Sequence, residues 1–282
     1  MAYCLTNLIQ GAVGRLGSGA YVRTTATGGS TTTFVDTKFE DRWDDDSFKD
    51  GTCIVVRDTG GVAPEGQFAR ISGYTASTFT GTVDTALTVA IASGDEIMII
   101  QPLYPLVELR RLANCALQNL GGIQKWDESL TTVASQLEYA LPTAFKFRAP
   151  SRVYVQTDTT YDAWKEIFDW RVQPAAPGSS AALILNTSRD GGYKIGLWGI
   201  DTHPTVYAYD DPIDESIIPV LAELMLASSI YEYIGVTDDN RNAANKVLAD
   251  LEEAKKRWPI PLPSKSGRGL LWSTDMPSDD LR

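Results

Sequence analysis

The stretch PLVELRRLANCALQNLGG, residues 105–122, decides how the rest of the chain can be organised. Its apolar residues recur at i, i+3 and i+4 spacing: Leu106, Leu109, Leu112, Ala113, Ala116, Leu117 and Leu120. This period predicts an amphipathic helix over 105–121, which Pro105 opens and which Gly121 and Gly122 end. Because one apolar stripe cannot be buried alone, we expect this helix to pack against other helices.

Residues 213–234 predict a second helix. Pro219 fits its first turn and Gly235 ends it. Its apolar positions are Ile217, Val220, Leu221, Leu224, Met225, Ala227, Ile230, Tyr231 and Ile234. Such a helix needs a covering partner along most of its length.

Residues 237–257 predict a third helix, with Thr237 as its N-cap. Acidic residues in the first turn and basic residues in the last suit the helix dipole: Asp238 and Asp239, then Lys255, Lys256 and Arg257. Its apolar stripe is Ala243, Ala244, Val247, Leu248, Leu251 and Ala254. We therefore expect a discontinuous helical core built from residues 102–122 plus 210–258.

The segment before the first of these helices has the period of β-structure. Short β-prone runs at 33–35, 53–56, 68–71, 79–83 and 97–100 alternate with turn sequences. Residues 31–101 therefore predict a small β-barrel or sandwich. Residues 1–30 predict a short helix, Asn7–Leu16 capped by Thr6, and then a flexible linker.

Residues 123–209 predict a second β-module, a sandwich with strands at 136–141, 152–156, 167–172, 182–185, 194–198 and 205–209. Asp190-Gly191-Gly192 is typical of a hairpin turn. Most of the aromatic residues of this module are Tyr154, Tyr161, Trp164, Phe168, Trp170, Tyr193 and Trp198. They suit core packing, and the alternative is a platform for carbohydrate or peptide. The expected class is α+β, with two antiparallel β-modules inserted in or appended to the helical core.

Composition excludes several classes of function. The net charge is −11 and no cluster of Lys and Arg is present, so we expect no binding to the phosphates of nucleic acids. Three widely spaced cysteines, Cys4, Cys53 and Cys115, favour neither disulfides nor zinc, and Cys115 is expected to be a buried free thiol. No signal peptide and no apolar run of membrane-spanning length is present, so a soluble protein made in a reducing cytoplasm is expected.

Residue patterns that could carry chemistry are weak. The single histidine, His203, has no nucleophile elbow to serve. Gly11, Gly14 and Gly17 do not form a phosphate-binding loop. The acidic stretch 36–50 lacks the register of a calcium loop and is expected to be solvated charge near a strand edge. We nominate no catalytic residue, cofactor or metal, and expect a protein that is not an enzyme.

Several local patterns resemble those of one protein family. They are Ser30–Asp36, Trp43–Thr52, Arg70–Tyr74, Phe79–Val83, Leu112–Leu117, Tyr139–Pro142, Arg152–Val155 and the helices between 215 and 257. Together they resemble the head-to-tail connector, or neck adaptor, proteins of tailed phages, over about residues 30–258. None of them is a chemical signature.

The resemblance implies a virion protein that forms a homo-oligomeric ring, commonly a dodecamer, below the portal and around the DNA path. Partners would be the portal protein and downstream neck or tail proteins, with DNA passing through unbound. Residues 259–282 would be an extended C-terminal arm, with Leu270, Leu271 and Trp272 as its docking residues. The alternative function is a tail-associated carbohydrate-binding or hydrolytic module.

Overall fold

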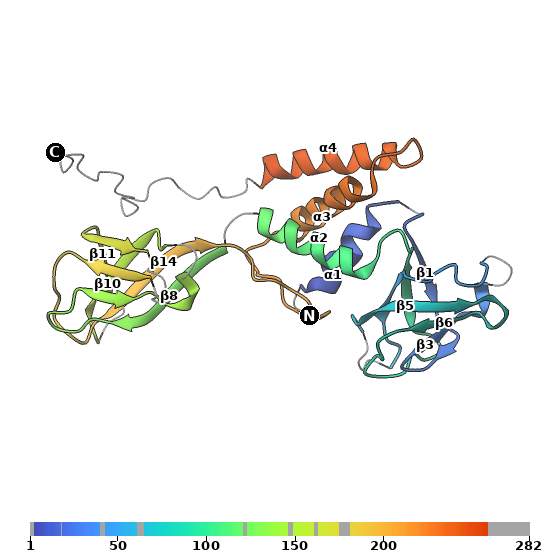
Figure 1. Ribbon diagram of the computed structural model, residues 1–282, viewed down its shortest axis with the longest axis horizontal. Coiled ribbons are helices and arrows are strands. Elements are labelled where there is room, and N and C mark those ends of the chain that lie inside the picture. The colour runs from blue at the N-terminus through green and yellow to red at the C-terminus, as the bar shows by residue number, and fades with distance from the viewer. Residues whose placement is uncertain are drawn as a thin grey trace, which may run out of the picture. The chain divides into compact units, whose positions relative to one another are not determined.

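The computed structural model describes residues 3–17, 19–39, 43–60, 65–120, 123–145, 149–160, 163–174 and 181–258. Within them the fold is α+β as expected, with four α-helices and antiparallel sheets (Figure 1). The described residues of Met1–Leu120 and His203–Ile260 form one compact unit, and those of Gly121–Thr202 form another. None of the described helices combines the length and the apolar character that a membrane crossing requires.

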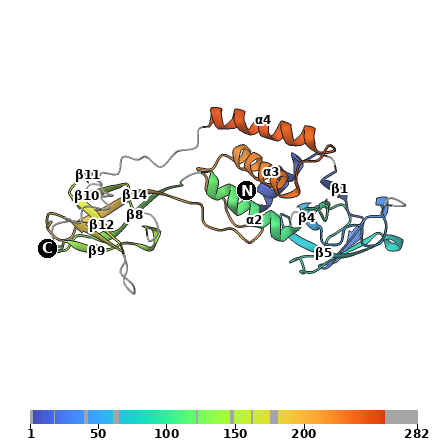
Figure 2. The same ribbon diagram turned by 45° about the horizontal axis from the view of Figure 1, so that its top comes forward.

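The helices of the first unit are α1 (Leu5–Gly14), α2 (Leu106–Asn119), α3 (Pro219–Ile234) and α4 (Arg241–Arg257). Helix α3 packs against each of the other three, and α4 lies alongside it (Figures 1 and 2). Its buried residues point in all directions: Leu221, Ala222, Leu224, Leu226, Ala227, Ser228, Ile230 and Tyr231. A helix that is apolar all round is stable only when it is covered all round, so α3 takes the central position.

The helix ends differ from the prediction in several places. Helix α3 begins at Pro219 instead of residue 213, and α1 ends at Gly14 instead of Leu16. Helix α1 begins after Cys4 rather than after Thr6, whose buried hydroxyl instead lies 2.9 Å from the carbonyl oxygen of Tyr209. Helix α4 begins after Asn240 rather than after Thr237, because the Asn240 side chain accepts the Thr237 N–H at 2.8 Å and closes a turn there. Pro219 and Gly235 lie where they were expected.

The first unit also contains a seven-stranded antiparallel sheet of order β1-β7-β4-β5-β6-β3-β2. Its strands are β1 (Tyr21–Thr25), β2 (Gly28–Gly29), β3 (Thr33–Val35), β4 (Thr52–Arg57), β5 (Phe68–Thr75), β6 (Thr80–Val83) and β7 (Glu96–Ile100). The five predicted runs coincide with β3 to β7. Strands β1 and β2 lie where a flexible linker was expected, which is wrong because residues 21–25 pair along the whole of β7.

Both faces of the central strands are buried. On β7, Ile97 and Ile99 belong to a cluster within the β-module, whereas Met98 and Ile100 belong to the cluster that contains the helices. Ile54 and Phe68 join the helical side in the same way. The helices therefore bury their apolar faces against this sheet as well as against one another, and the continuous apolar run of β7 follows from this double burial.

The second unit consists of a four-stranded sheet, β11-β10-β14-β8, and a three-stranded sheet, β12-β13-β9. The strands are β8 (Ile123–Thr131), β9 (Glu138–Ala140), β10 (Arg152–Asp158), β11 (Ala163–Ile167), β12 (Trp170–Gln173), β13 (Ala182–Leu185) and β14 (Lys194–Asp201). One hydrophobic cluster joins residues of both sheets, among them Val153, Leu183 and Leu197. Alternate residues of β10 and β14 face this cluster, as period-2 strands require.

Four local predictions for residues 123–209 are wrong. Strand β8 was missed, and the run 167–172 is two strands of different sheets, β11 and β12. Gly191 and Gly192 do not form a hairpin within one sheet, because β13 and β14 belong to different sheets. Residues 205–209 form no strand. Instead the Asn114 side chain on α2 bonds both backbone groups of Val206, at 2.8 and 2.9 Å.

Gly81 offers a test of packing in the first sheet. It pairs with Phe34 across β6 and β3, and the fully buried Phe34 ring occupies the space that a Cβ at Gly81 would need. We expect Gly81→Ala to lower the free energy of unfolding by about 1–3 kcal/mol, as overpacking does. Gly28→Ala in β2, where a Cβ meets no atom, is the control and should change it by less than about 1 kcal/mol. Equal losses in urea unfolding would contradict this account.

Candidate functional site

The outer face of the four-stranded sheet carries an aromatic side chain from every strand. Trp126 comes from β8, Trp198 from β14, Tyr154 from β10 and Trp164 from β11. We call these four residues the aromatic face. They alternate with residues of β10 and β14 that turn inward to the core, such as Val155 and Leu197. Trp126 keeps 45% of its side chain exposed.

The Trp126 ring contacts two of the other rings. The Trp126 and Trp164 rings meet edge to face, with centroids 5.1 Å apart and an interplanar angle of 88°. The Tyr154 ring lies 5.5 Å from that of Trp126. Since β8 and β11 are the two edge strands, these rings reach across the two central strands to meet.

Gly196 makes this contact possible. It lies on the central strand β14, opposite Tyr154 of β10. A Cβ at Gly196 would collide with the Trp126 ring and would lie 3.1 Å from the Trp164 ring. The missing side chain therefore leaves the space in which rings from opposite edges of the sheet come together.

Charged side chains border the aromatic face and pair with each other. The Arg152 guanidinium lies 5.4 Å from the centre of the Trp198 ring and 3.9 Å from Glu166. A hydrogen bond to Tyr154, together with the charge of Glu166, raises the pKa of Arg152. Lys194 pairs with Glu128 at 3.2 Å. These two cations and two carboxylates balance one another in charge.

The other predicted aromatic residues have different surroundings. Trp170 is buried between the two sheets, and Tyr193 packs against the same cluster. Phe168 is 71% exposed at the turn between β11 and β12, and Tyr161 lies outside the described residues. Trp126 was missed because β8 was not predicted as a strand. The charged residues of β8 obscure the alternation of apolar and polar residues that marks a strand.

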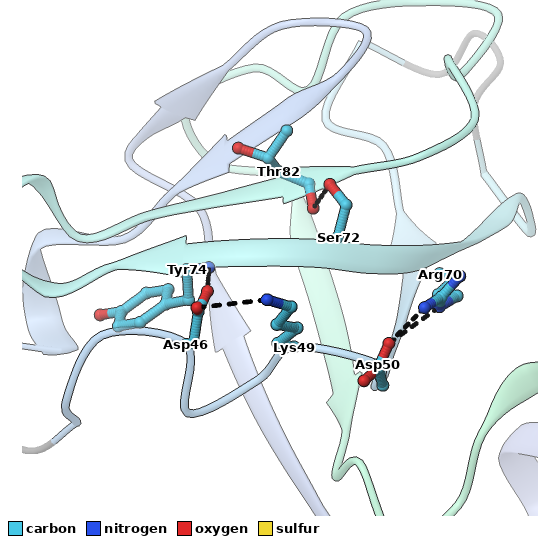
Figure 3. A network of polar contacts seen from close by, with 7 residues as sticks. All are labelled: Asp46, Lys49, Asp50, Arg70, Ser72, Tyr74 and Thr82. Carbon is cyan, nitrogen blue, oxygen red and sulfur yellow. Dashed lines mark hydrogen bonds and ion pairs between the residues drawn. The ribbon is translucent and has the colours of Figure 1, made fainter.

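The acidic stretch 36–50 is only partly solvated charge. Asp46 Oδ1 accepts the N–H of Tyr74 at 3.3 Å, and Asp50 pairs with Arg70 (Figure 3). Lys49 lies 3.5 Å from the other oxygen of Asp46, while on the far edge of β5 Ser72 donates to the carbonyl of Thr82. Glu40 and Asp41 lie outside the described residues. Asp46 and Asp50 are about half exposed, as expected of solvated charge, and they also fasten a turn to β5.

The remaining candidates have structural surroundings or lie outside the described residues. His203 is buried, and its Nε2 accepts the Asp214 N–H at 3.1 Å, which pins the segment that leads to α3. Cys115 is exposed, which corrects the expectation of a buried thiol. Cys53 is buried, and burial raises the pKa of its thiol to about 12. Among the described residues, no three His, Cys, Asp or Glu side chains are placed to hold a metal ion.

The predicted docking residues Leu270, Leu271 and Trp272 lie outside the described residues, and so does the whole of 259–282. Gly121 and Gly122, expected to end the first predicted helix, lie outside them too. These predictions stay predictions.

Asp95 is a fully buried carboxylate before β7. It offers a test of whether acidic residues of the first unit stabilise the fold. Its Oδ1 accepts the N–H and hydroxyl of Thr59 at 2.9 and 2.8 Å, and its Oδ2 accepts the Ala92 N–H at 2.8 Å. Burial alone would raise the pKa of Asp95, but these hydrogen bonds outweigh it and hold the pKa below the ordinary value of 3.8. The contribution to stability is therefore complete above that value and is lost as pH falls through the folded-state pKa.

We expect Asp95→Asn to cost about 1–3 kcal/mol of unfolding free energy at pH 7, because an amide NH₂ would face an N–H donor. Urea unfolding at several pH values should show this cost shrinking below pH 3.8. A cost that stays constant down to pH 2, roughly two units below the ordinary Asp value, would contradict the role of the ionised carboxylate.

Comparison with known proteins finds no family model and no curated protein that matches the chain.

Proposed function

We propose that this chain is a structural virion protein of a tailed phage. In this proposal it is a head-to-tail adaptor, made in the host cytoplasm, that forms a ring below the portal. The ring extends the DNA channel and docks the tail. The proposal begins from the resemblance of the sequence to neck adaptors, and it draws support from the arrangement of the helices.

The proposal includes a discontinuous helical core from which both β-modules project. In chain order, the first sheet lies between α1 and α2, and the second unit lies between α2 and α3. All four helices contribute to one hydrophobic cluster, which the residues of β4, β5 and β7 complete. A helical body joined to two β-modules suits a ring subunit, because the body can hold its neighbours while the modules meet other partners.

The observation that carries the proposal is an exposed surface on α2 and the end of α3. Val107, Arg111 and Cys115 follow i, i+4, i+8 spacing on α2, and all three are exposed. Arg111 pairs with Glu108 at 2.7 Å, and the hydrogen bond and charge of Glu108 raise the pKa of Arg111. Cys115 and Tyr233 of α3 make smaller contributions to that pKa, so both lie in its neighbourhood. Val107 is 68% exposed and Tyr233 47%. We call Val107, Arg111, Cys115 and Tyr233 the α2–α3 surface.

The composition of the α2–α3 surface suits a protein interface. Exposed apolar groups that gather around an arginine and a tyrosine are typical of contact patches. Ring closure requires a heterologous contact, in which one surface of a subunit meets a different surface of the next. The net charge of −11 also suits a channel wall along which DNA slides without being held.

Ring formation is the first test. We expect the purified chain, mixed with the portal protein of the same phage, to form closed rings in native mass spectrometry and electron microscopy. Val107→Glu should reduce the ring fraction about tenfold, since it places a charge in the contact. The melting temperature of the protomer should not change, because the side chain is largely exposed.

The matched control is Val133→Glu, which makes the same change at a residue of the second unit that is 52% exposed. This variant should form rings as the unmodified chain does. A chain that stays monomeric beside the portal would contradict the adaptor function. Normal rings from Val107→Glu would contradict the α2–α3 surface alone.

The C-terminal residues provide the second test. We expect deletion of 264–282 to leave the protomer folded by circular dichroism but to abolish binding to the portal, because Leu270, Leu271 and Trp272 are lost. Deletion of 273–282, which keeps these three residues, is the control and should bind normally. Unchanged portal binding after the longer deletion would refute the docking role.

A further inference from the structure

We propose that the aromatic face of the second unit is a binding site for a neutral glycan. The inference does not depend on the adaptor function, because it rests on the geometry of the aromatic face and of the charged residues at its border. It assigns the second unit a task of its own, the recognition of a polysaccharide.

The first step is that this face holds aromatic surface where a stable fold does not require it. The core of the second unit lies between its two sheets, on the opposite side of β10 and β14. Trp126 nevertheless stays 45% exposed, supported by Tyr154 and Trp164. Aromatic side chains present large, rigid apolar surface with little conformational entropy to lose on binding.

The second step is the chemistry of the ligand. A pyranose ring has faces of C–H groups, which pack on an indole, and a rim of hydroxyls, which need both donors and acceptors. The aromatic face supplies the indoles, and its border supplies Arg152 and Lys194 as donors and Glu166 and Glu128 as acceptors. An apolar platform with a few polar groups around it is the usual composition of a small-molecule site.

The third step is charge. A nucleic acid or an anionic polymer would need unpaired cations at the surface. Here Arg152 and Lys194, the two cations of the border, each have a carboxylate partner, at 3.9 and 3.2 Å. A neutral ligand is therefore the electrostatic match, and among such ligands a polyhydroxylated one can use both members of each ion pair.

Gly196 allows the position of the Trp126 ring to be changed while all four aromatic side chains are kept. The Trp126 ring lies over this glycine, and a methyl group there would displace the ring from its contact with Trp164. If Trp126 served only to cover the glycine, displacing it would change stability and nothing else. If the ring positions form a platform, displacing it also weakens the binding of sugar.

The experiment uses the full chain and three neutral linear oligosaccharides, composed of glucose, galactose or N-acetylglucosamine. Binding is measured by isothermal titration calorimetry and by the change in tryptophan fluorescence. We expect at least one of the three to bind, and Trp126→Ala to weaken its affinity about tenfold. Gly196→Ala should weaken it similarly, whereas Trp126→Phe, which keeps a ring, should retain most of it.

Phe168→Ala is the matched control, since this residue is an exposed aromatic of the same unit outside the aromatic face. It should bind as the unmodified chain does, and the melting temperatures of all variants report whether each is folded. Absence of binding to all three oligosaccharides at millimolar concentration would overturn the proposal. Self-association in sedimentation that is lost in Trp126→Ala would overturn it too, because the face would then be a contact between two copies of the chain.

Discussion

Helix α3 buries apolar side chains on every side, and it can do so only because α1 and α2, from distant parts of the chain, and the neighbouring α4 cover it. Burying each Leu or Ile contributes about 1.5–3 kcal/mol to the free energy of unfolding, so the packing of these three helices on α3 is strongly favourable. The Tyr231 hydroxyl fixes the register by donating to the carbonyl of Leu16, just beyond α1, at 2.8 Å. Two long β-segments consequently have to leave the helical cluster and return to it.

The contact between α1 and α3 is organised around one carboxylate. Glu223 of α3 accepts from Arg15 at 2.6 Å and from the Tyr3 hydroxyl at 3.3 Å. A Cβ at Gly11 would occupy the space of the Glu223 side chain, so the glycine allows the close approach. Burial and the nearby Glu223 raise the pKa of Tyr3, which keeps its hydroxyl a donor. The polar groups of this partly buried ion pair therefore satisfy one another at the helix crossing.

The parts of this fold that the sequence predicts are those that local periodicity controls. The stripe of α2 and the strands β3 to β7 follow from spacing alone, as do Pro219 and Gly235 at the ends of α3. The errors arise where distant pairing decides: β1 forms because β7 offers an edge, and Val206 is held by Asn114 in place of a strand partner. The candidate site was predicted by residue type for Tyr154, Trp164 and Trp198. Trp126 and Gly196 were not, because their contact spans both edges of a sheet whose strand order no local pattern reveals.

The two units use their sheets in opposite ways, and the difference bears on function. In the first unit, neighbouring residues of β7 belong to different hydrophobic clusters, so both faces of the sheet are buried in the core. In the second unit, the three-stranded sheet covers only one side of β10 and β14, which leaves the other side to Tyr154 and Trp198. The rings of this face lie on the side of the sheet away from the core, and Trp126 stays 45% exposed there. A surface that is apolar, rigid and charge-balanced without serving the core is therefore explained better by a ligand than by stability.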